Sequence, residues 1–172
     1  NDIAQDDVLG SIFFQAPDEG AGTDAILVAA GIEAVSEGDF SSSSNATSLI
    51  FKTGASEAAA EKVRIKSDGS VGIGTNAPSD NLEITPSADE KGLTLKTTAN
   101  IRPYINLESN RSAAGNNIGH INFKWNGTEV ARILAVAGTD TTNKDDAHMT
   151  FQTASAGSPA ERIRIKPNGT IG

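Results

Sequence analysis

Apolar and polar residues alternate over several short stretches of the chain. Residues 63–65 read Val-Arg-Ile, residues 71–73 read Val-Gly-Ile, and residues 49–53 and 149–153 both end in Phe-x-Thr. Alternation with a period of two is typical of strands with one apolar face. Glycine, asparagine, aspartate and serine gather between these stretches, as they do in turns. The pattern predicts an all-β chain of short strands and hairpins.

The strand-like stretches recur along the chain. Residues 61–72 correspond to residues 161–172, and residues 49–53 to residues 149–153, with an offset of 100. Two weaker matches join residues 10–15 to 119–124, offset 109, and residues 28–31 to 135–138, offset 107. Because repeats dictate architecture more firmly than local propensity does, we predict two tandem copies of one β-rich unit, residues 1–84 and residues 85–172. The second copy stops within the motif and the chain lacks an initial methionine, so we expect a piece of a longer protein.

Strand parity predicts the length of the turn between residues 65 and 71. A three-residue loop, Ser67-Asp68-Gly69, pairs Ile65 with Val71 and keeps the apolar side chains of both strands on one face. A two-residue loop would place them on opposite faces. The second copy has Pro-Asn-Gly at this position, which suits the same turn and puts Gly169 at the left-handed position. The predicted structural core of these hairpins is Val63, Ile65, Val71, Ile73, Ile163, Ile165 and Ile171.

A different turn is predicted at Asn126-Gly127. This dipeptide favours a two-residue type I′ loop, which pairs Lys124 with Glu129 and Phe123 with Val130. Gly127, like the glycines of the other two turns, is therefore predicted to serve backbone geometry.

Composition and charge exclude several classes of function. The chain has 14 basic and 22 acidic residues, a net charge of -8, so it offers no basic surface for nucleic acid. It has no cysteine, hence no disulfide framework or thiolate metal site. No apolar stretch approaches the roughly 20 residues of a membrane-spanning helix. We expect no nucleic-acid partner and no membrane insertion.

The candidate chemical motifs are weak. The glycines at 72 and 74 superficially fit a dinucleotide loop, but Pro78 and the absence of a helical period argue against one. The aspartates lack calcium-loop spacing, and His120 and His148 have no ligand or nucleophile nearby in sequence. We therefore expect no enzyme, metal or cofactor. A carboxylate pair for glycan hydrolysis stays an open alternative, because spacing across strands is not visible in a sequence. Tyr104 and His120 are weak candidates for contact with a glycan.

One repeat boundary resembles a known family. Residues 69–84, Gly-Ser-Val-Gly-Ile-Gly-Thr-Asn-Ala-Pro-Ser-Asp-Asn-Leu-Glu-Ile, follow a Phe-x-Thr strand and a Glu-x-Val-Arg-Ile strand. This order is similar to repeats of phage tail fibres and tailspikes, which also occur in bacterial surface proteins. The resemblance covers nearly the whole chain. It implies a homotrimeric rod, β-prism or β-helix-like, with chains that are intertwined or side by side.

The resemblance also implies a function. We expect a structural segment of a tail fibre or tailspike in the virion tail that takes part in host attachment. Its expected partners are two further copies, other tail proteins and a host surface polysaccharide. The first alternative is a bacterial surface adhesin or extracellular filament, located outside the cell or on its surface. The second is a polysaccharide depolymerase.

Overall fold

The computed structural model describes residues 2–16 and 26–172, and these residues contain no α-helix. The all-β prediction is confirmed. The chain divides into two compact units, Asn1–Leu95 and Lys96–Gly172. The boundary predicted after residue 84 separates two sequence repeats, whereas this division rests on compactness. The repeat boundary therefore stays a prediction.

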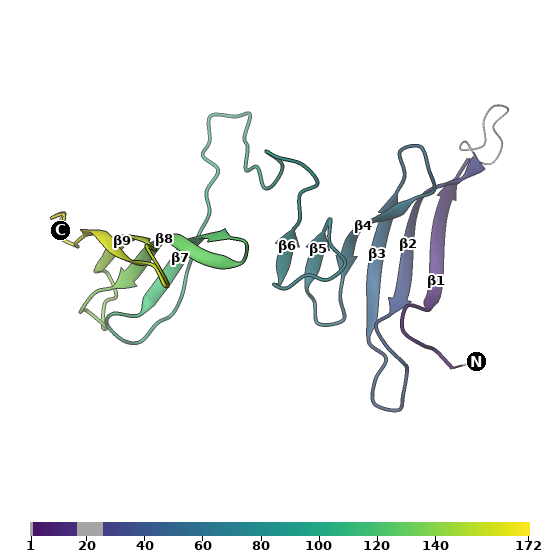
Figure 1. Cartoon of the computed structure of the whole chain (residues 1–172), viewed down its shortest axis with the longest axis horizontal. Coiled ribbons are helices and arrows are strands. Elements are labelled where there is room, and N and C mark those ends of the chain that lie inside the picture. Colours follow the sequence, from purple (N-terminus) through teal and green to yellow (C-terminus); the bar gives the residue numbers. More distant parts are fainter. Residues whose placement is uncertain (1, 17–25) are drawn as a thin grey trace. The chain divides into compact units, whose positions relative to one another are not determined.

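The first unit contains one open sheet of six strands in the order of the chain (Figure 1). Neighbouring strands are antiparallel as far as β5, whereas β5 and β6 are parallel. The strands are β1 Val8–Gln15, β2 Val28–Ser36, β3 Thr47–Thr53, β4 Ala60–Ile65, β5 Val71–Ile73 and β6 Leu82–Ile84.

The second unit contains an open antiparallel sheet of four strands in the order β10-β9-β8-β7. The strands are β7 Asn117–Trp125, β8 Thr128–Ala137, β9 Ala147–Thr153 and β10 Ala160–Ile165. Beyond β10, Ile171 forms a single bridge to Ile165. This bridge corresponds to the pairing of Val71 with Ile65 in the first sheet.

The hairpin turns follow from parity and glycine. Ile65 pairs with Val71 and Val63 with Ile73, the register of a three-residue loop. Gly69 and Gly169 have φ values of 85° and 80°, where a side chain is disfavoured.

The Asn-Gly hairpin agrees with its prediction except at one pair. Asn126 and Gly127 both have positive φ, as a type I′ turn requires, and Lys124 pairs with Glu129. Phe123, however, pairs with Ala131, and the predicted pairing with Val130 is wrong. A β-bulge inserts Val130 as an extra residue, which two-residue parity cannot anticipate.

Strand pairing also corrects the weakest sequence match. Ile32 lies between Ile12 and Phe51, and Ile133 lies between Ile121 and Phe151. Position 32 therefore corresponds to position 133, an offset of 101, and the alignment of residues 28–31 with 135–138 is wrong. Between β3 and β4 the pairing is the same as between β9 and β10 at the predicted offset of 100.

Except for Ser36 at the end of β2, the buried side chains lie on the face opposite to the predicted core. The buried apolar residues are Val35, Ile50, Leu134 and Val136, and the buried polar ones are Glu33, Ser36, Ser48 and Thr150. Of the predicted core, Ile65, Ile73, Ile163, Ile165 and Ile171 are exposed, and Val63 and Val71 are half-buried. Each unit contains a single sheet, so among the described residues no second sheet of the same unit covers this side. These residues therefore do not form a core within their own unit.

Candidate functional site

The largest candidate surface is a continuous apolar face on each sheet. Directly paired residues in neighbouring strands point to the same side. On the first sheet one row therefore runs across all six strands, and it consists of Ile12, Ile32, Phe51, Val63, Ile73 and Ile84. A second row beside it consists of Gly10, Ala34, Leu49, Ile65, Val71 and Leu82. We call these two rows the first apolar face.

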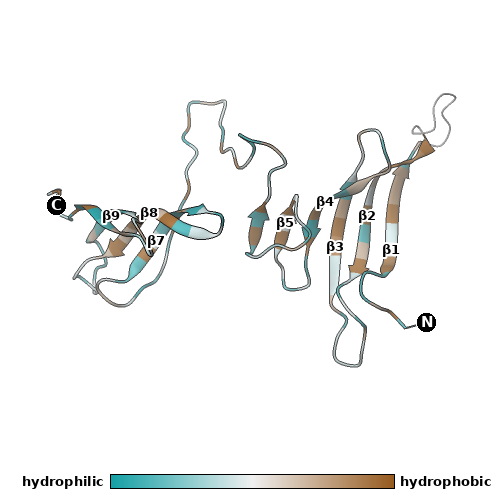
Figure 2. Ribbon diagram, viewed as in Figure 1, coloured by the Kyte–Doolittle hydropathy of each residue, from teal (hydrophilic) through white to brown (hydrophobic). Residues whose placement is uncertain are grey.

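The second sheet carries an equivalent surface. One row consists of Ile121, Ile133, Phe151 and Ile163, and the other of Gly119, Ala135, Met149, Ile165 and Ile171. We call these rows the second apolar face. Hydrophobic residues recur along the strands of both sheets in Figure 2. Exposure reaches 60% at Ile12 and 73% at Ile171. Contiguous apolar surfaces of this kind mark contact sites.

The opposite side of each sheet holds the buried apolar residues together with charged side chains that pair with one another. The Glu61 carboxylate accepts two hydrogen bonds from the Arg64 guanidinium, at 2.8 and 2.7 Å, and Lys52 bonds Glu33 at 3.0 Å. In the second sheet Arg164 bonds Glu161 in the same bidentate way. The hydrogen bonds to Glu61 raise the pKa of Arg64 against the opposing effect of its partial burial. This side needs no external partner for its charges.

Glu37 joins two loops of the first unit. Its carboxylate accepts hydrogen bonds from the Ser48 hydroxyl at 2.7 Å and from the Ser67 amide and hydroxyl at 2.7 and 2.8 Å. Partial burial acts to raise the pKa of Glu37, but these bonds and the nearby Lys66 outweigh it and lower the pKa. The ionised carboxylate thus holds the turn after β4 against the start of β3.

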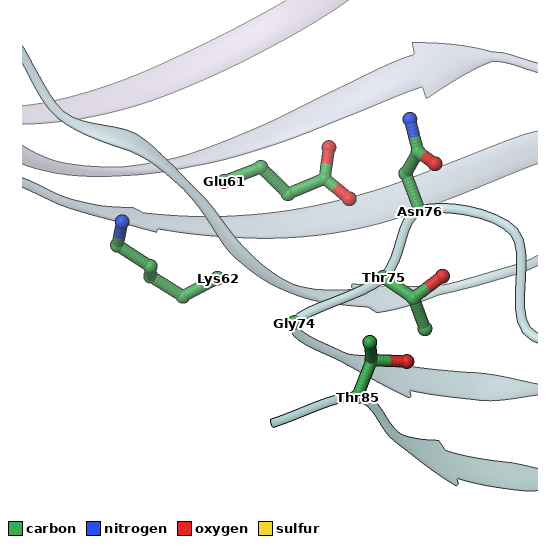
Figure 3. A pocket seen from close by; sticks show the side chains of 6 residues that line it. All are labelled: Glu61, Lys62, Gly74, Thr75, Asn76 and Thr85. Carbon is green, nitrogen blue, oxygen red and sulfur yellow. The ribbon is translucent and has the colours of Figure 1, made fainter. Parts of the chain in front are cut away.

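The glycine-rich segment borders an open polar hollow rather than a phosphate cradle. Figure 3 shows its lining, Glu61, Lys62, Gly74, Thr75, Asn76 and Thr85. Gly74 donates its N–H to the Lys62 carbonyl at 2.9 Å, and its φ is 76°. A Cβ at Gly74 would collide with the carbonyl oxygen of Thr85. The glycine therefore allows close backbone approach, and Glu61 is already engaged by Arg64.

The structure does not bring the two candidate glycan contacts together. Tyr104 is 81% exposed and lines a hollow with residues 100–103. His120 is exposed on β7 and lines another hollow with residues 106–108. His148 is half-buried and pairs with Val136. Trp125, which sequence reasoning did not single out as a contact, is 79% exposed at the tip of its hairpin.

Two other kinds of site are absent from the described residues. Among residues 2–16 and 26–172, no three His, Asp or Glu side chains are grouped as metal ligands. The same ranges contain no helix long and apolar enough to cross a membrane.

Comparison with known proteins shows the fold. No protein-family model matches the chain, and no curated protein matches it in sequence. Among solved structures, the carboxy-terminal domain of the bacteriophage T5 L-shaped tail fibre superposes with a TM-score of 0.74 at 13% identity, over 99% of this chain and 80% of that one. The structure of this domain with its intramolecular chaperone domain gives a TM-score of 0.73 at 14% identity, and this chain spans 56% of it. The chain therefore has a fold similar to that of a phage tail-fibre domain.

Proposed function

We propose that the chain is a structural segment of a phage tail fibre, located in the virion tail. The observation that carries this proposal is the fold similarity to the T5 tail-fibre domain, which extends over 99% of the chain and so includes both units. The tandem repetition of strand order and register fits a rod built from successive similar segments.

The functional unit of this proposal is a homotrimer, formed from copies that cover each other's apolar faces. The support is physical. Full burial of a side chain such as Phe51 or Ile73 stabilises an assembly by roughly 1.5 to 3 kcal/mol. Single-layer sheets leave these side chains in water, whereas closed assembly would cover both the faces and the sheet edges. The chain acts by assembly, without catalysis and without a cofactor.

Charge substitution on the apolar faces tests this arrangement. Phe51→Glu and Phe151→Glu each place a carboxylate in the middle of a row, at equivalent positions of the two sheets. Ser56→Glu adds the same charge in the exposed loop before β4 and serves as the control. Both phenylalanine variants should lower the sedimentation mass towards that of one chain while the far-ultraviolet strand signal persists. An unchanged mass would show that these faces are not buried between copies.

We also propose that the chain takes part in host attachment. Tyr104 is the more favourable of the two candidate glycan contacts, because its ring is 81% exposed and can stack on a sugar. A panel of purified lipopolysaccharides and capsular polysaccharides, immobilised and probed with the chain, tests it. We expect binding to at least one polysaccharide, weakened by Tyr104→Ala more than by His120→Ala. Equal binding by Tyr104→Ala would remove this residue from the contact.

A further inference from the structure

A strand-like stretch follows β6 without a strand partner. Leu93, Thr94 and Leu95 alternate apolar, polar and apolar, and the two leucines are 67% and 46% exposed. Within the described part of the chain, no backbone hydrogen bond reaches these three residues. Backbone groups and apolar side chains are thus both left in water, although the pattern is that of a strand with one apolar face.

Strand β6 has a free edge. Its other edge is taken by β5, since the Val71 amide bonds the Asn81 carbonyl and the Thr85 amide bonds the Ile73 carbonyl, each at 2.9 Å. Alternate residues of a strand direct their N–H and C=O groups to opposite edges. Leu82 and Ile84 therefore direct theirs outward, at the end of the sheet where the described residues provide no further strand.

The two features match in spacing. Leu82 pairs with Val71 and Ile84 with Ile73, so these two side chains end the two rows of the first apolar face. Leu93 and Leu95 have the same two-residue spacing. A strand that placed them beside Leu82 and Ile84 would continue both rows.

The two features also match in charge. Residues 79–85, around β6, contain Asp80 and Glu83 and no basic residue. Residues 91–97 contain Lys91 and Lys96 and no acidic residue. Opposite charges on facing strands favour pairing.

We propose that residues 93–95 of one copy pair along the free edge of β6 in a second copy of the chain. The proposal rests on the assembly proposed above and names a contact between its copies. The partner is a second copy because the single chain leaves both edges unpaired, although a connection of only residues 85–92 separates them. The paired strand would extend the first apolar face and close an edge that otherwise templates uncontrolled association.

The absence of cysteine allows a direct test by engineered disulfides. Glu83 lies between Leu82 and Ile84, as Thr94 lies between Leu93 and Leu95, so the two residues would face each other. The variant E83C/T94C should form inter-chain disulfides on mild oxidation, seen as multiples of the chain mass on a non-reducing gel. A mixture of E83C chains with T94C chains should give a disulfide-linked dimer. E83C/A88C, with the second cysteine in the connection, is the matched control and should stay largely at the mass of one chain.

Three outcomes overturn the proposal. The first is a disulfide within one chain, which consumes the thiols of E83C/T94C without raising the mass. The second is equal inter-chain linkage in E83C/A88C, which would indicate random collision. The third is thiols that stay free in the oxidised double variant.

Hydrogen exchange of the unmodified chain separates this proposal from the assembly itself. In the assembled protein the amides of residues 93–95 should exchange at least about tenfold more slowly than those of residues 87–91, because paired strands open rarely. If the chain is an oligomer but both groups exchange equally fast, the pairing with β6 is wrong and the proposed assembly stands. A folded monomer would overturn both.

Discussion

The two sheets place opposite residue types at equivalent buried positions. In the first sheet Glu33, 6% exposed, pairs with Ile50, 5% exposed. In the second sheet Leu134, 3% exposed, pairs with Thr150, 1% exposed. The polar and the apolar member of the pair have exchanged strands. This face therefore requires one apolar residue in the pair, without fixing which strand supplies it.

The neighbouring residues change together with this exchange. Glu33 has Lys52 as its partner at 3.0 Å. The residue equivalent to Lys52 is Gln152, which bonds Arg132 at 2.7 Å and Thr150 at 3.1 Å. In each sheet the buried polar group thus has its own partner, as buried polar groups require.

The two apolar faces, in contrast, have apolar residues at equivalent positions of both sheets. Ile32 and Ile133, Phe51 and Phe151, Leu49 and Met149, and Ile65 and Ile165 occupy equivalent positions. Every one of these pairs is apolar, although these side chains are more exposed than those of the polar face. Exposed apolar surfaces of this kind mark contact sites, and for this reason our proposal places the contacts between copies there.

The largest loss of stability is expected when the buried acidic residue of the first sheet is introduced at the equivalent position of the second sheet. Leu134→Glu buries a carboxylate beside Thr150, where Gln152 stands at the position of Lys52 and the nearby Arg132 and Arg164 already pair with Glu129 and Glu161. It should cost about 3 kcal/mol or more of unfolding free energy. Glu33→Leu makes the reverse change, and it should stay within about 1 kcal/mol because Lys52 can remain in water. Denaturant unfolding monitored by circular dichroism measures both. Equal losses would contradict the explanation of the exchange.

A smaller loss of stability is expected when turn glycines are replaced by alanine. Its size should depend on whether the added Cβ meets other atoms. Gly74→Ala meets the Thr85 carbonyl and a positive φ together, so it should cost about 3 kcal/mol. Gly69→Ala and Gly169→Ala have open space and bear only the backbone strain, about 1 kcal/mol each. Thermal melting of the three variants tests this order. If the melting temperature of Gly74→Ala equals that of the other two variants, close backbone approach is not the reason for glycine at position 74.

The smallest effect concerns pH and distinguishes the two turns. In the first turn, hydrogen bonds from Ser70 lower the pKa of Asp68, and Glu37 has a lowered pKa as described above. A carboxyl group with a lowered folded-state pKa contributes stability above its ordinary value, here 4.5 for Glu37, and loses it as the pH falls through the folded value. The second turn has Asn168 in place of Asp68, and its side chain accepts the Thr170 amide without titrating.

Below pH 4.5, hydrogen exchange relative to the intrinsic rates should therefore become faster at residues 66–70. At residues 166–170 it should not change. Glu37→Gln should remove part of this dependence, whereas Glu57→Gln, in an exposed loop, should not alter it. Identical acid responses of the two turns would exclude the carboxylates as their cause.

Much of the fold could be predicted from local patterns, and the failures have physical causes. The register of Ile65 with Val71 follows from alternation and one turn glycine, because both are local. The bulge at Val130 and the 101-residue offset of β2 and β8 were missed, since an inserted residue shifts parity without a sequence signal.

The sequence predicted which residues share the candidate surface, but not that the surface is exposed. Alternation identified Val63 and Ile73 as members of one face, but it could not show that no second sheet of the same unit covers this face. Burial depends on which layers pack together, and parity does not contain that information. The ion pair of the buried Glu33 with the half-buried Lys52 had no sequence signal either, because the two residues lie on different strands.

In the proposed assembly, copies of the chain cover the apolar faces of one another. Sedimentation equilibrium of the unmodified chain over a range of concentrations tests it most directly. We expect a species of about three times the 17.7 kDa chain mass with a β-sheet circular-dichroism spectrum. A folded species that sediments as a single chain at every concentration would contradict it.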